Sequence, residues 1–98
     1  FLCREGRVAE ISGSSLPAGI LQGIHYERRT VRLREGDLIV MMSDGALSVA
    51  PDWMKEELAL AAGEPVQKIA ERLANLSKRN EHGRGDDITI MEARVVRV

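Results

Sequence analysis

The sequence predicts an α+β fold, in which two helices cover one face of a mostly antiparallel sheet. Short apolar or alternating segments, separated by glycine-containing turns, occupy the first 42 residues. Two helical patterns then follow one another, over residues 52–62 and 65–79, instead of alternating with strands. A last strand pattern covers residues 88–96. Helices grouped together beside an antiparallel sheet are typical of the α+β class.

Two hairpins are expected in the first half of the chain. The first joins residues 1–3 to residues 7–11, and Gly6 supplies the positive φ that a tight turn needs. In the second, residues 26–34 form a strand whose end alternates between apolar residues and arginines. Gly36 then turns the chain into the next strand.

The segment Leu38 to Met42 is expected to be the central strand. Its five consecutive apolar residues are too few for an ordinary helix and fit a strand buried on both faces. Ser43-Asp44-Gly45 follows directly, so a rigid element holds a carboxylate at its end. The glycine would let the backbone approach an ion or a phosphate. A plain turn is the alternative, because Asp-Gly is a generic turn signal.

Two helices are expected after a connector at residues 46–50. The first covers residues 52–62, after Pro51 at a favourable helix start and before Gly63. The second runs from Pro65 to about residue 79. Its apolar residues recur at the spacing of an amphipathic helix, at Val66, Ile69, Ala70, Leu73 and Ala74.

Composition indicates a soluble globular domain or a part of one. The 98 residues are 44% hydrophobic and 30% charged, with a net charge of −1. No basic stripe is present, so nucleic-acid binding has no support. No apolar run approaches the ~20 residues of a membrane span. The single cysteine, Cys3, favours a reducing, cytoplasmic location. A start at Phe1, inside a strand pattern, suggests a portion of a longer protein.

A second segment with carboxylates, Asp86-Asp87, directly precedes the last strand. If the two apolar strands are neighbours, Asp86 and Asp44 converge, and converging like charges need a cation or a proton. Carboxylates without histidine or cysteine clusters suit Mg²⁺ or Mn²⁺. Two such ions ~3.5–4 Å apart can activate a water and hold a phosphoryl group. A polar loop or a strand-start cap is the alternative for this pair.

These segments together resemble the C-terminal half of the type 2C metal-dependent serine/threonine protein phosphatases, in particular their bacterial stage II sporulation protein E branch. The resemblance covers nearly the whole chain. It lies in Gly36-Asp37-Leu38, Met41-Met42, Ser43-Asp44-Gly45, Asp86-Asp87-Ile88-Thr89, Leu16-Pro17-Ala18-Gly19-Ile20 and the helix from Pro65 to Leu73.

The resemblance implies a sandwich of two antiparallel sheets flanked by helices, of which residues 1–98 are the C-terminal portion. It implies a dinuclear Mn²⁺ or Mg²⁺ centre with Asp44 and Asp86 as ligands and the backbone of Gly45 close by. Asp87 matches a position that is asparagine in many relatives. Asp87 is therefore expected at most to orient a metal ligand, without binding the metal itself. The other metal carboxylates of the family lie upstream of residue 1.

The resemblance also implies a function. The expected substrate is a phosphoserine on a phosphorylated anti-anti-sigma factor, and the parent protein is expected to carry a membrane region before this portion. A stress-response sigma-pathway phosphatase and a non-catalytic regulatory or interaction module with the same fold are the alternatives. The isolated chain is expected to be inactive and to form a homodimer through an exposed sheet face.

Overall fold

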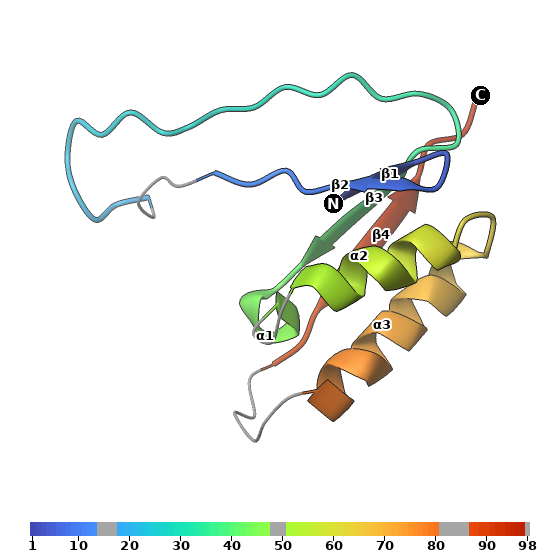
Figure 1. Ribbon diagram of the computed structural model, residues 1–98. Helices are drawn as coiled ribbons and strands as arrows, with labels where there is room; N and C mark the ends of the chain where they lie inside the picture. The colour runs from blue at the N-terminus through green and yellow to red at the C-terminus, as the bar shows by residue number, and fades with distance from the viewer. Residues whose placement is uncertain (14–17, 48–50, 81–86, 98) are drawn as a thin grey trace.

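The computed structural model describes residues 1–13, 18–47, 51–80 and 87–97. Four strands form one antiparallel sheet in the order β2-β1-β3-β4. Helices α2 and α3 lie together on one side of that sheet (Figure 1). The α+β prediction is therefore confirmed. The elements are β1 (Leu2–Arg4), β2 (Arg7–Ala9), β3 (Leu38–Met42), α1 (Asp44–Leu47), α2 (Pro51–Leu60), α3 (Val66–Asn80) and β4 (Ile90–Arg94).

The core lies between the sheet and the two long helices. Met54 and Leu58 of α2 and Ile69 and Leu73 of α3 are at most 2% exposed. They pack with Val40 of β3 in one cluster, so the apolar face predicted for the second helix is its buried face. No helix within the described ranges combines the length and the apolar character needed to cross a bilayer.

Strand β3 is central, but it is buried on one face only. Leu38 and Val40 point toward the helices and are 5% and 2% exposed. Met41, on the other face, is 53% exposed, and its cross-strand partner Met91 is 56% exposed. Burial of β3 on both faces is therefore not reached within the described residues, and the uncovered face is the exposed sheet face expected for a portion of a domain. None of the described helices lies over the second face.

The first hairpin is confirmed and the second is wrong. Leu2 pairs with Ala9 around a turn in which Glu5 and Gly6 both have positive φ, as a two-residue hairpin turn requires. Residues 26–34 form no strand, although the predicted turn at Gly36 is present with a φ of 89°. The physical reason is that β3 already pairs with β1 on one edge and β4 on the other, so no edge of β3 remains for the preceding segment.

Element ends also differ from the prediction. The connector expected over residues 46–50 begins as part of a short helix, α1, which starts at Asp44; residues 48–50 lie outside the described ranges. Helix α2 ends at Leu60, two residues early, and Gly63 adopts a φ of 86° in the turn that follows. Strand β4 covers Ile90–Arg94, the part of the predicted strand that faces β3.

Candidate metal centre

The antiparallel pairing of β3 and β4 brings the two predicted carboxylate segments to one end of the sheet. Met42, the last residue of β3, pairs with Ile90, the first residue of β4. The segment that follows β3 therefore lies beside the segment that precedes β4, although they are far apart in the sequence (Figure 1). This juxtaposition was the condition for a shared site, and the structure meets it.

Ser43 joins the two segments by three hydrogen bonds. Its backbone N–H donates to the carbonyl of Thr89 at 2.9 Å. Its hydroxyl accepts from the backbone N–H of Thr89 at 2.9 Å and donates to the carbonyl of Asp87 at 3.2 Å. Sequence reasoning treated Ser43 only as part of a motif. Its bridging position depends on strand register, which a sequence pattern does not supply.

The predicted metal ligands are placed as follows. Asp44 is the first residue of α1, and its side chain is exposed. Gly45 is buried in the same short helix, and its predicted approach to an ion stays a prediction. Asp86 lies outside the described residues, so the convergence of its carboxylate with that of Asp44 also stays a prediction. Asp87 is described and exposed.

The donor chemistry at Asp44 fits one side of a site for a hard cation. Its exposed carboxylate makes no hydrogen bond or ion pair with another described residue, and oxygen ligands of this kind are those that Mg²⁺ and Mn²⁺ take. Across residues 1–13, 18–47, 51–80 and 87–97, no three histidine, cysteine, aspartate or glutamate side chains gather as a complete metal site. A metal site that includes Asp44 would therefore need ligands from outside the described part of the chain.

Asp37, in the matched Gly36-Asp37-Leu38 segment, serves a structural purpose at the other end of β3. The Arg4 guanidinium donates to both of its carboxylate oxygens, at 2.8 and 2.6 Å, and the N–H of Arg34 donates to one of them at 2.8 Å. The Asp37 side chain is 1% exposed. The Arg4 hydrogen bonds hold the pKa of Asp37 at about 2, despite burial, so the pair is ionised at neutral pH.

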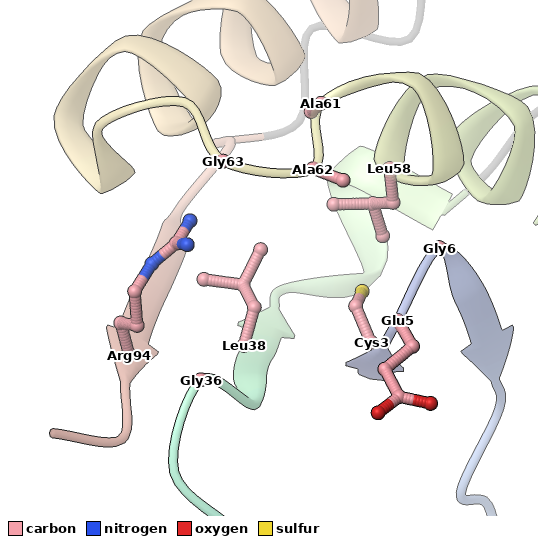
Figure 2. A pocket seen from close by; sticks show the side chains of 10 residues that line it. All are labelled: Cys3, Glu5, Gly6, Gly36, Leu38, Leu58, Ala61, Ala62, Gly63 and Arg94. Atoms are coloured by element: carbon pink, nitrogen blue, oxygen red, sulfur yellow. The ribbon is translucent and has the colours of Figure 1, made fainter.

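A cavity of about 200 Å³ also lies at that other end of the sheet. Figure 2 shows it between Leu38, Arg94 and Cys3 of the strands and Leu58 of α2. Burial raises the pKa of the Cys3 thiol, so the thiol stays neutral and is a poor nucleophile. This cavity opens beside the start of β3, whereas Asp44 follows its end, so the cavity is separate from the candidate metal centre.

Comparison with known proteins identifies the family of this chain. A sequence model of the family described as stage II sporulation protein E (SpoIIE) matches residues 1–96. The chain belongs to the SpoIIE family. Over 97% of its length it is 32% identical to stage II sporulation protein E of Bacillus subtilis (strain 168) and 28% identical to that of Priestia megaterium.

The fold of the SpoIIE-family chain also matches a solved structure. That structure is the phosphatase domain of the cell fate determinant SpoIIE from Bacillus subtilis, with a TM-score of 0.78 and 31% identity over the whole of this chain. The chain covers 45% of that solved domain, and 12% and 17% of the two curated relatives. It therefore corresponds to less than half of a phosphatase domain of this family.

Proposed function

We propose that this chain is the C-terminal portion of a metal-dependent phosphoprotein phosphatase domain that acts on phosphoserine. The observation that carries the proposal is that Ser43 joins the segment after β3, which contains Asp44, to the segment before β4, which contains Asp87. Membership of the SpoIIE family supports it, because a relative with 31% identity is a phosphatase domain.

In this proposal Asp44 and Asp86 are metal ligands contributed by this chain, and the remaining ligands come from the rest of the domain. Mn²⁺ or Mg²⁺ ions, when bound, polarise the phosphoryl oxygens and lower the pKa of a bound water. The contribution of the chain is to place the Asp44 carboxylate at the start of a short helix that follows strand β3. Accurate placement matters, because phosphoryl transfer depends mainly on positioning and charge stabilisation.

The substrate and setting are further parts of the proposal. We infer a phosphorylated anti-anti-sigma factor as substrate, on the strength of the resemblance to the sporulation branch. A cytoplasmic location for this portion accords with a single, buried, unpaired cysteine. A membrane region elsewhere in the parent protein is compatible with both inferences.

The test is Asp44→Asn in the full-length protein, assayed with Mn²⁺ on a phosphoserine-bearing protein substrate. We expect most of the metal-dependent turnover to disappear while the fold is kept, because the amide is a weaker ligand than the carboxylate. Asp52→Asn is the matched control. Asp52 is likewise an exposed aspartate in the first turn of a helix, α2, and its replacement should leave turnover unchanged.

An unchanged rate for Asp44→Asn at saturating Mn²⁺ would remove Asp44 from the metal centre. Absence of any turnover in the unmodified full-length protein, on phosphoserine substrates and with either metal, would instead favour a non-catalytic regulatory module.

A further inference from the structure

The hydroxyl of Ser43 accepts one hydrogen bond and donates another, and both partners lie in one short segment of the chain. It accepts from the N–H of Thr89 and donates to the carbonyl of Asp87. A serine hydroxyl has one donor hydrogen, and here that hydrogen is directed to the segment that precedes β4. We call these two side-chain bonds the Ser43 clamp.

The clamp lies just beyond the end of the β3–β4 strand pairing. The β3–β4 pairing ends at Met42 and Ile90. Beyond it, Thr89 and Asp87 are exposed and Ile88 is only partly buried, so packing contributes little to fixing residues 87–89. One backbone bond, from Ser43 N–H to the Thr89 carbonyl, continues the ladder by one step. The side chain of Ser43 extends the attachment two residues further, to Asp87.

The clamp also sits directly beside the candidate ligand. Ser43 is covalently attached to Asp44, and its carbonyl accepts a hydrogen bond from Ala46 N–H at 3.0 Å as α1 begins. One residue therefore closes the start of α1 with its carbonyl and holds the facing segment with its hydroxyl. Any rotation of residues 87–89 away from α1 has to break the clamp.

We propose that Ser43 is a positioning residue for the metal centre, which holds the segment at residues 87–89 in register with Asp44. This inference rests on the proposed function. Residues that orient metal ligands without touching the metal cost about 10–100-fold in metal affinity when they are removed. Loss of the hydroxyl should therefore weaken metal binding through the geometry of the segment, with the carboxylates themselves intact.

The experiment compares Ser43→Thr with Ser43→Val in the full-length protein. The two side chains have nearly the same shape and are both β-branched, but only threonine retains the hydroxyl. Mn²⁺ alone is titrated by calorimetry, and amide hydrogen exchange of the peptide covering residues 87–90 is measured without metal. Ser12→Ala, at an exposed loop serine far from β4 in the chain, is the control for loss of a serine hydroxyl.

We expect Ser43→Val to weaken Mn²⁺ binding by about tenfold or more and to speed exchange at Thr89, whose N–H loses its acceptor. Ser43→Thr and Ser12→Ala should keep the affinity and the slow exchange of the unmodified protein. Ser43→Ala, which removes the hydroxyl without adding bulk, should behave like the valine variant. That agreement would exclude a steric effect of valine.

Equal Mn²⁺ affinity for the valine and threonine variants would overturn the role of Ser43, even if exchange at Thr89 changed. Asp44→Asn is titrated beside them to separate the two proposals. If Asp44→Asn lowers the affinity and Ser43→Val does not, only the Ser43 inference fails. If Asp44→Asn leaves Mn²⁺ affinity unchanged, the proposed role of Asp44 as a metal ligand fails, and the inference fails with it.

Discussion

At the scale of single residues, Glu92 is an acidic residue in surroundings that disfavour its charged form. It lies on the helix-facing side of β4, opposite Val40, and neither carboxylate oxygen has a hydrogen-bond partner among the described residues. The two arginines that act on its carboxylate are hydrogen-bonded elsewhere: Arg72 binds the Glu64 carboxylate, and Arg94 donates to the Glu64 carbonyl at 2.8 Å. Burial raises the pKa of Glu92 to about 7, against the opposing effect of the two arginines.

This carboxylate predicts a pH dependence of stability. Because the folded-state pKa is above the ordinary value of 4.5, the folded state binds the proton more tightly than the unfolded state. The contribution of Glu92 to stability is therefore complete below about pH 4.5 and is lost as the pH rises through about 7. Glu92→Gln, which is neutral throughout, should lack that dependence.

The measurement is the melting temperature of the full-length protein and of Glu92→Gln between pH 5 and pH 8. We expect the melting temperature of the variant to rise relative to the unmodified protein as the pH increases. Glu56→Gln on α2, at an exposed position, is the control. A constant difference between Glu92→Gln and the unmodified protein across this range would show that Glu92 titrates at its ordinary pKa.

At the scale of elements, α3 was predictable because its signal is long and strongly periodic. Fifteen residues repeat the amphipathic pattern, and Ile69 and Leu73 are fully buried as that pattern requires. Residues 26–34 carry a strand pattern at their end, yet they form no strand. A helix satisfies its own backbone hydrogen bonds, whereas a strand needs a partner edge, and strand pairing depends on the whole sheet.

Leu73→Asp tests the packing of α3. The substitution places a charge with no partner in an apolar contact, so we expect a loss of about 3–5 kcal/mol in the free energy of unfolding. Denaturant unfolding of the full-length protein, followed by tryptophan fluorescence, provides the measurement. Leu60→Asp is the matched control, because Leu60 is 81% exposed at the end of α2 and should change the stability by less than about 0.5 kcal/mol.

The candidate site was predictable only in part, because its geometry, like that of the strands, depends on which strands pair in the whole sheet. The sequence indicated which residue types suit a hard cation and placed Asp44 at a strand end. The pairing that brings the neighbourhood of Asp87 beside it was stated as a condition, and it follows from antiparallel register. The Ser43 clamp and the α1 helix that begins at Asp44 depend on three-dimensional contacts among short polar segments, which have no periodic signal.

At the scale of the whole molecule, the uncovered sheet face is the feature that favours association between chains. Ile39, Met41 and Met91 share that face, and beside it Phe1 and Ile11 help to line a shallow cavity of about 400 Å³. Apolar surface of this kind promotes association. We propose that the isolated 98-residue chain self-associates through this face and, with only part of the metal ligands, has no enzymic turnover.

Light scattering on the purified chain, beside a phosphatase assay with Mn²⁺, tests both expectations. The double substitution Met41→Lys with Met91→Lys should reduce the associated mass, because lysines on the face oppose apolar contact. Leu60→Lys, at an exposed apolar residue on α2, should leave it unchanged. A monomeric chain, or turnover that Asp44→Asn abolishes, would contradict the corresponding expectation.

The position of β3 between β1 and β4 also determines how this chain can fold. Both partners of β3 are remote in sequence: the amino group of Phe1 bonds Val40 across 39 positions, and Thr89 bonds Ser43 across 46. Closing such long loops costs entropy before any contact compensates for it, which slows folding. The β1–β2 hairpin and the α2–α3 pair are local in sequence and can form early. We therefore expect the sheet, and with it the alignment of Ser43 with residues 87–89, to be completed last.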